Sequence, residues 1–319
     1  MANLHDIERR ILSVSSTKQI TRTMEMVSAA KIRVATTRME NALPWAEAIS
    51  NMVISTAKYT SGETQPLLQR HEQVKRVLVC VIASDRGLAG GFNTNILRRA
   101  EKLIKAKQAQ GCDVEVVACG KKAVGYMTYR GINPVFKFID TSADPTVEQA
   151  QVLSDYIGKE YVKDENPLDE IYIIFNHAKN AAEQTLVTQI ALPVNEETYE
   201  ELFKGMNDDV FEEFTKDNKL RIDEDKKHDG PLYGDIDFEP NPEDVLEYLL
   251  KGYVQNAIYY ALLDSAAGEQ GARRNAMKSA TDNANEMIST LTRVYNRARQ
   301  GAITTEINEI VGGAAALEE

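Results

Sequence analysis

With 319 residues and a hydrophobic content of 43%, the sequence can form one large globular domain or two ordinary ones. Its formal net charge of −11 argues against general affinity for nucleic acid or anionic lipid, because both favour clustered positive charge. We see no signal peptide and no apolar run long enough to cross a bilayer, so we expect no direct insertion into a membrane.

The first predicted element is a long helix from about Leu4 to Tyr59. Neither Gly nor Pro precedes Pro44, and the polar turn cluster TSGETQP follows the predicted end. Its apolar residues recur at three-, four- or near-seven-residue spacings, as on one face of a helix: Ile7, Ile11, Val14, Ile20, Met24, Val27 and Val34.

The same segment is basic within an acidic chain, with seven Lys and Arg against four Asp and Glu in residues 1–40. Such a run is commonly a solvated face. Here, beside a seam of small residues, it favours an acidic protein partner recognised by charge complementarity.

The middle of the chain, residues 74–194, alternates short β-rich runs with helical segments. The runs are 74–84, 113–120, 133–140, 169–177 and 183–194, and helices at about 94–110, 121–129 and 146–162 separate the first four. This alternation predicts a Rossmann-like α/β domain with a mainly parallel sheet. Its three cysteines, Cys80, Cys112 and Cys119, lack CxxC spacing and are expected to be buried free thiols.

The stretch SDRGLAGGFNTN, residues 84–95, follows the first of these runs and opens a helix. A phosphate-cradling loop would lie at such a place, but neither GxGxxG nor a P-loop lysine is present. A tight turn that needs Gly for close backbone approach is the favoured interpretation. Asp85 and Arg86 could form a structural ion pair there or a docking contact.

No catalytic signature and no metal site are apparent, so we predict no catalytic residue, no cofactor and no metal ligand. The four histidines are scattered without HxxxH or CxxC companions, which favours surface or capping roles over metal ligation: His5, His71, His177 and His228.

Residues 195–242 form a mostly acidic insertion, predicted to hold a short amphipathic helix followed by a loop. Its apolar side would carry Leu202, Met206, Val210, Phe211 and Phe214.

A second very long helix is predicted from Glu243 to Val311. Its seam residues are Val245, Leu249, Val254, Ile258, Leu262, Ala276, Ala280, Ala284, Met287, Leu291, Val294 and Ala298. Glycines at 268 and 271 predict a slight bend or a close helix contact. Two such helices can bury their stripes only by pairing, so residues 1–60 and 243–319 are predicted to form one antiparallel coiled coil.

The C-terminal end continues an apolar helix past the end of any partner helix, with Ile303, Ile307, Ile310, Val311 and Leu317. Exposed apolar surface of this kind usually marks an interface. We therefore expect the tip to be held by an apolar partner.

Three stretches together closely resemble the gamma subunit of the F-type ATP synthase, the central rotor shaft. They are STKQITRTMEMVSAAKIRVA, SDRGLAGGFNTN and the segment from EQGARRNAMKSATDNANEM to NEIVGGAAAL. The resemblance covers both terminal helices and the start of the α/β domain, and ITTEINEIVGGAAA is its most specific part.

The resemblance implies a non-catalytic subunit that couples ion-driven rotation of a membrane c ring to ATP synthesis on the beta subunits. It assigns beta-subunit contacts to Arg22, Met24, Lys31, Arg33, Arg299, Gln300 and Thr304. It assigns a bearing tip to Ile303, Ile307, Ile310 and Val311, and a foot facing the c ring and the epsilon subunit to Asp235, Asp237, Phe238 and Glu239.

The implied partners are the alpha and beta subunits, the epsilon subunit and the c ring, at the cytoplasmic face of a bacterial inner membrane. One alternative is a coiled-coil adaptor that tethers another acidic partner, which would not require SDRGLAGGFN or the C-terminal motif. The other is a nucleotide-binding α/β enzyme with helical arms.

Overall fold

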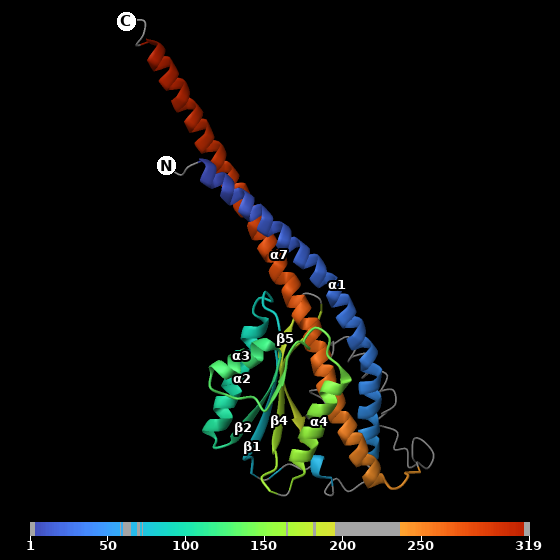
Figure 1. The fold of residues 1–319 in the computed structure, drawn as a ribbon. Helices are drawn as coiled ribbons and strands as arrows, with labels where there is room; N and C mark the ends of the chain where they lie inside the picture. The colour runs from blue at the N-terminus through green and yellow to red at the C-terminus, as the bar shows by residue number, and fades with distance from the viewer. Residues whose placement is uncertain are drawn as a thin grey trace, which may run out of the picture. The chain divides into compact units, whose positions relative to one another are not determined.

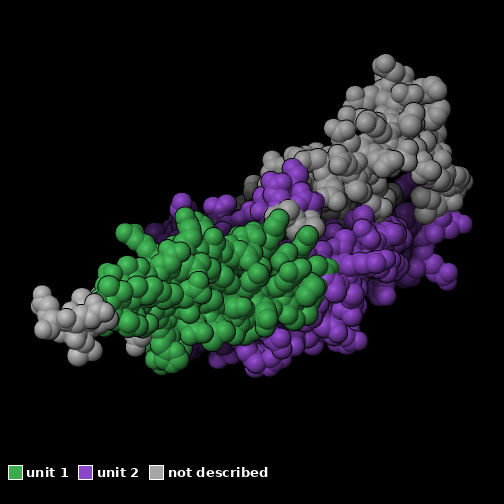
Figure 2. All heavy atoms as spheres, turned by 90° about the horizontal axis from the view of Figure 1, so that it is seen from above, with its two compact units in different colours: residues 1–29, 273–319 green, residues 30–272 purple. Residues whose placement is uncertain are grey.

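A computed structural model describes residues 4–57, 59, 65–68, 71, 73–163, 165–180, 183–194 and 237–315. The chain divides into two compact units, residues 1–29 with 273–319 and residues 30–272, coloured separately in Figure 2. We refer to them as the helical unit and the α/β unit. The two long terminal helices each contribute to both units.

The α/β unit is built on a five-stranded sheet in the order β3-β2-β1-β4-β5. The strands are β1 (Arg76–Ile82), β2 (Asp113–Cys119), β3 (Phe136–Phe138), β4 (Glu170–His177) and β5 (Thr185–Leu192). Three neighbouring pairs are parallel and the β4/β5 pair is antiparallel. A mainly parallel sheet was predicted, and only β3 is much shorter than its predicted run.

Helices cover both faces of the sheet (Figure 1). One face packs against α2 (Phe92–Ala109) and α3 (Lys121–Tyr129), through side chains such as Ile96 and Met127. The other face packs against α4 (Val147–Tyr161) and the first part of α7, through Leu153 and Leu250. Central strands are therefore buried on both sides, which explains their nearly continuous apolar runs.

The two terminal helices are α1 (Leu4–Ala57) and α7 (Pro242–Ala315), close to their predicted limits. A short 3-10 helix, η2 (Pro66–Leu68), lies between α1 and the sheet in sequence. In the part of the chain that the structure describes, no helix combines the length and apolarity that a bilayer crossing requires.

In the helical unit the first part of α1 lies beside the second half of α7 (Figure 1). Thr21 and Thr281 are both buried, and their hydroxyl oxygens lie 2.8 Å apart. Buried or half-buried positions recur at alternating spacings of four and three residues along α1, at Ile7, Ile11, Val14, Lys18, Thr21, Glu25 and Ser28. They do so along α7 at Met277, Thr281, Ala284, Ile288, Leu291, Tyr295, Ala298 and Ala302.

The predicted seam was wrong at five positions. Ile20, Val27 and Val34 on α1, and Met287 and Val294 on α7, are between 47% and 61% exposed. Thr21 and Ser28, one residue beyond Ile20 and Val27, are buried instead. Because Thr21 and Ser28 are polar, a pattern of apolar residues could not indicate that they are buried. The prediction therefore selected their apolar neighbours Ile20 and Val27 instead.

Two glycines of α7 allow close packing inside the α/β unit. A Cβ at Gly252 would come within 2.7 Å of Ile49 Cδ1 on α1, so this glycine permits a close helix contact. A Cβ at Gly268 would lie 3.0 Å from the carbonyl oxygen of Asn176, at the end of β4. The close approach predicted near residue 268 is therefore present, but it is made to a strand end.

Candidate partner-binding surfaces

The basic residues predicted on α1 lie on its surface. In the helical unit Arg22 is exposed and Met24 is half-buried; in the α/β unit Lys31 and Arg33 are exposed. Among the described residues, no ion pair joins Arg22, Lys31 or Arg33 to an acidic side chain. Their charges remain available to an acidic surface outside the chain. Arg38, by contrast, forms an ion pair with Asp144.

The end of α7 presents an apolar surface that the described residues of the helical unit leave uncovered. Exposure reaches 47% at Ile303, 53% at Ile307, 71% at Ile310 and 61% at Val311. Ile303, Ile307 and Ile310 follow the three- and four-residue spacing of one helix face. Figure 1 shows this end of α7 extending beyond the N-terminal end of α1.

The polar residues predicted beside the tip are also exposed. Arg299, Gln300 and Thr304 lie on the surface of α7. The Thr304 hydroxyl donates to the carbonyl of Gln300 at 2.9 Å, so its hydrogen is used within the helix while its oxygen can still accept.

The predicted foot precedes α7. Asp235 lies outside the described residues. Asp237 and Glu239 are exposed, whereas Phe238 is half-buried and its ring lies 5.3 Å from that of Tyr59. The segment leads into Asn241, whose side chain accepts the Asp244 N–H at 2.8 Å and caps the helix. Its two acidic side chains therefore face solvent next to a fixed helix start.

Asp85, in the glycine-rich turn after β1, bonds to backbone groups that lie outside this turn. Asp85 accepts backbone N–H groups from Lys121 at 2.9 Å, Asp140 at 2.9 Å and Ser142 at 3.0 Å. Burial alone would raise the pKa of Asp85, but these bonds outweigh it and lower the pKa. Lys121 opens α3, so a negative charge already fills this helix start. Within the turn, the Phe92 N–H donates to the Ala89 carbonyl at 3.1 Å and Gly90 has a φ of 56°, so the tight turn is present. A Cβ at Gly87 or Gly91 would meet only side-chain atoms, so close backbone approach does not explain these two glycines.

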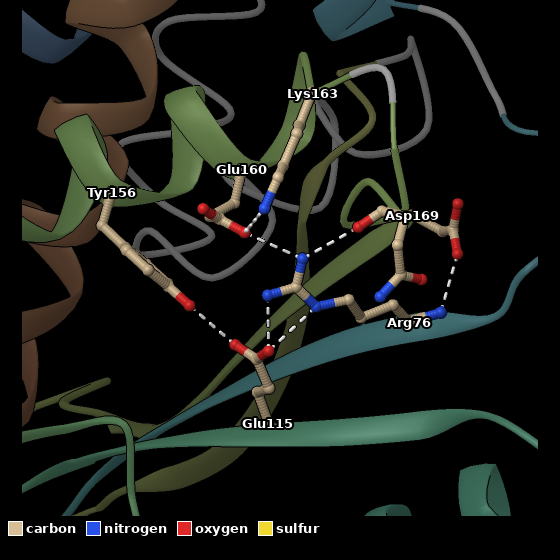
Figure 3. A network of polar contacts seen from close by, with 7 residues as sticks. Arg76, Glu115, Tyr156, Glu160, Lys163 and Asp169 are labelled. Carbon is tan, nitrogen blue, oxygen red and sulfur yellow. Dashed lines mark hydrogen bonds and ion pairs between the residues drawn. The ribbon is translucent and has the colours of Figure 1, made fainter.

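A buried polar network fixes the amino ends of the strands (Figure 3). Arg76 donates through Nε to Glu115 at 2.8 Å and through Nη1 to Glu160 at 2.8 Å. Tyr156 donates to Glu115, and burial together with this bond raises the pKa of Tyr156 to about 12. Asp169 accepts the Arg76 N–H at 2.7 Å. The network joins β1, β2, α4 and the start of β4, and its ionic groups satisfy one another.

One histidine contradicts the expected surface or capping role, and a second is half-buried. His177 is buried, and its Nδ1 lies 2.6 Å from Asp264 Oδ2 on α7. His71 Nδ1 lies 2.5 Å from Asp169 Oδ1. His5 is exposed as expected, and His228 lies outside the described residues. The acidic partners of His177 and His71 are distant from them in sequence, so no local spacing could have indicated these pairs.

All three cysteines are buried free thiols, as predicted.

This chain is similar to known proteins over nearly its whole length. The sequence model of the ATP synthase family matches residues 3–317. The ATP synthase gamma chain of Heliobacterium modesticaldum is 39% identical over 99% of this chain and all of its own length. That of Desulforamulus reducens is 40% identical over the full length of both. The chain belongs to the ATP synthase gamma chain family.

The fold of this gamma chain family member is also similar to a solved one. A chain in the cryo-EM structure of the Euglena gracilis mitochondrial ATP synthase with OSCP, F1 and c-ring superposes with a TM-score of 0.63. The similarity covers 98% of this chain and 94% of the other at 19% identity, so it bears on the fold alone. Full-length membership in the gamma chain family does not favour the adaptor alternative.

Proposed function

We propose that this chain is the central-stalk subunit of a membrane-associated, proton-translocating F-type ATP synthase. The observation that carries the proposal is the exposed apolar end of α7, which a monomer leaves in water, in a chain related to gamma chains over its full length. The chain is then the non-catalytic rotor, and ATP forms on the beta subunits.

The shaft would be an antiparallel coiled coil of α1 and α7. The buried Thr21–Thr281 contact and the alternating four- and three-residue spacing of buried positions support this assignment. A coiled coil of two different helices has no rotational symmetry. Three chemically identical beta subunits would therefore meet three different faces, and each rotation step would change which conformation is favoured at each catalytic site.

The exposed cations of α1 suit the acidic beta surface that this role requires. Arg22, Met24, Lys31 and Arg33 would contact the beta subunits, as would Arg299, Gln300 and Thr304. Ile303, Ile307, Ile310 and Val311 would turn in an apolar bearing of the alpha–beta hexamer. The foot, with Asp237, Phe238 and Glu239, would face the c ring and epsilon subunit at the cytoplasmic side of a bacterial inner membrane.

Reconstitution tests the proposal. This chain is mixed with alpha and beta subunits from the same source, complexes are separated by size, and ATP hydrolysis is assayed. We expect one copy of this chain per hexamer and hydrolysis that depends on it. If no complex forms and hydrolysis is unchanged by this chain, the result would contradict the proposal and favour the coiled-coil adaptor instead.

The bearing assignment has its own test. Replacing Ile307 with Asp places a charge on the exposed apolar face without touching the α/β core. We expect weaker assembly or lower hydrolysis by the complex, while the isolated chain unfolds at the same urea concentration. Truncation after Gln300 should act in the same direction. Full assembly and activity of both variants would refute the bearing role.

A further inference from the structure

The end of β4 holds α7 by a polar contact inside the α/β unit. Asp264 of α7 is 1% exposed, and its Oδ2 lies 2.6 Å from Nδ1 of His177, the last residue of β4. Its Oδ1 accepts the backbone N–H of Ala178 at 2.8 Å. Both oxygens of one buried carboxylate are therefore bonded to two consecutive residues at a strand end. We call these three residues the Asp264 clamp.

Gly268, about one helical turn beyond Asp264, approaches the same strand end. A Cβ at Gly268 would lie 3.0 Å from the carbonyl oxygen of Asn176 and 3.6 Å from the Phe92 ring at the start of α2. The Asn176 side chain in turn donates to the carbonyl of Phe92 at 3.4 Å. Residues four apart lie on one face of a helix, so α7 meets this strand end over a full turn.

Before this point α7 packs on the sheet through apolar side chains, which include Leu250, Val254 and Ile258. Burial of apolar surface is non-directional and does not by itself set one angle of the helix about its axis. A hydrogen bond does, because it weakens steeply when its distance or angle departs from the optimum. A slip of α7 by one turn would move Asp264 about 5.4 Å from its donors and leave a buried carboxylate unpaired.

α7 connects the predicted foot to the helical unit. It starts at Pro242, shortly after the foot residues Asp237, Phe238 and Glu239, and it continues beyond residue 272 into the helical unit. In the rotor role proposed above, torque applied near the start of α7 has to reach its far end. A helix that could turn or slide on the sheet would absorb part of that rotation.

We propose that the Asp264 clamp fixes α7 against turning and sliding on the sheet, so that the sheet and α7 rotate as one body. Asp264 and His177 are then positioning residues for torque transmission. Both are buried, so their effect does not require contact with another subunit. The mechanical part of this inference rests on the proposed rotor function, whereas the contact itself does not.

Single-molecule measurements separate this role from a contribution to stability alone. The chain is assembled with cysteine-free alpha and beta subunits, the hexamer is fixed to a surface, and a rod is attached through Gln108→Cys. Gln108 is exposed at the end of α2, and the native cysteines of the chain are buried, so labelling is selective. The angular fluctuation of the resting rod reports how firmly the α/β unit is held to the shaft.

Substitutions at Asp264 give the main comparison. Asp264→Leu removes both acceptors, and we expect a wider angular fluctuation and, in vesicles carrying the full complex, fewer protons pumped per ATP hydrolysed. Asp264→Asn keeps an oxygen for the Ala178 N–H and an amide that can donate to the His177 ring, so it should restore values near those of the parent. Arg76→Met breaks buried ion pairs at the opposite strand ends and should lower stability without widening the fluctuation.

Gly268→Ala is the second variant, in case Asp264→Leu does not assemble. Alanine favours the helix, so stability should not fall through helix propensity. The added Cβ would press on the Asn176 carbonyl and loosen the contact, so we expect a smaller widening than with Asp264→Leu. Unchanged fluctuation and pumping in every clamp variant that assembles, or equal widening with Arg76→Met, would overturn the proposal.

Hydrogen exchange in the isolated chain keeps this result separate from the rotor function. Asp264→Leu should speed amide exchange at Ala178 and in residues 260–268, with little change in β1. If this local effect is present but the parent chain forms no hexamer, the rotor function and the mechanical role fail while the contact is supported. If exchange is unchanged, the clamp does not hold α7, and the proposal fails even where the parent chain assembles.

Discussion

In the α/β unit the buried charged side chains pair with one another, whereas in the helical unit many charged and apolar side chains face solvent. Arg76, with its side chain 10% exposed, contacts two carboxylates. In the helical unit, Ile20, Met26, Val27 and Ile307 are all more than half exposed. The first unit pairs the buried charges of this network internally and carries stability. The second leaves surface uncovered, as an interaction surface does.

The largest difference between the units should appear on removing an ionic partner. Arg76→Met leaves Glu115 without its cation and Glu160 with only the more exposed Lys163, and we expect a loss of about 3–5 kcal/mol in the free energy of unfolding. The matched change in the helical unit is Arg9→Met, which breaks an exposed pair with Asp6 and should cost less than about 1 kcal/mol. Urea unfolding of the two full-length variants measures both values. Equal losses would contradict the comparison.

Isoleucine truncation tests the same contrast with apolar groups. Ile173 in β4 is fully buried, so Ile173→Ala should destabilise the chain by about 2–5 kcal/mol through lost burial and a cavity. Ile307→Ala removes an exposed side chain, and alanine favours the helix, so the free energy of unfolding should change by less than about 0.5 kcal/mol. A large effect at Ile307 in the isolated chain would mean that the chain itself covers the tip.

Acid should weaken the α/β unit through its internally bonded carboxylates. Burial would raise the pKa of Asp85 and of Asp169, but backbone N–H bonds outweigh it and lower both. A carboxyl whose pKa is lower in the folded state stabilises above its unfolded pKa of about 3.9 and loses that contribution as pH falls through the folded pKa. The urea concentration at the midpoint of unfolding should therefore decrease when the pH is lowered below about 4.

The Asp85→Asn variant separates this effect from general acid unfolding. It cannot ionise, so it should be less stable than the parent at pH 7 and lose less stability between pH 5 and pH 3. Urea midpoints measured at each pH give both slopes. Parallel slopes for parent and variant would exclude Asp85 as a source of the acid sensitivity.

The smallest expected effect lies at the polar seam of the helical unit. The carbonyls of Lys18 and Met277 lie within reach of the Thr21 and Thr281 hydroxyls in their own helices. Each hydroxyl has one hydrogen, so one can donate to its own carbonyl while the other donates across the seam, and either can turn to its own carbonyl if its partner is removed. Single Thr→Val changes should each cost less than about 1 kcal/mol, and the double variant should recover part of that loss. A double-mutant cycle by thermal unfolding measures the coupling. Strictly additive losses would show that the contact contributes nothing.

The elements of the α/β unit were predictable because the signals that define them are local. The helix at 121–129 was predicted at its observed limits, and four of the five strands closely match their runs. Continuous apolar runs of β-branched residues, bounded by Gly and polar turns, report burial on both faces. The sequence pattern alone indicated an apolar tip and a basic face, but the subunits that would contact them could be named only through resemblance to a family.

Sequence by itself determined that both ends form long helices, that a mainly parallel sheet lies between them, and that an apolar tip is left over. Tertiary structure alone decided which line of α1 is buried, because Thr21 rather than Ile20 meets a hydroxyl from residue 281. It also decided that His177 pairs with Asp264 and Arg76 with Glu115. Hydrophobic spacing records which residues avoid water, whereas a polar side chain becomes buried only where folding places a partner beside it.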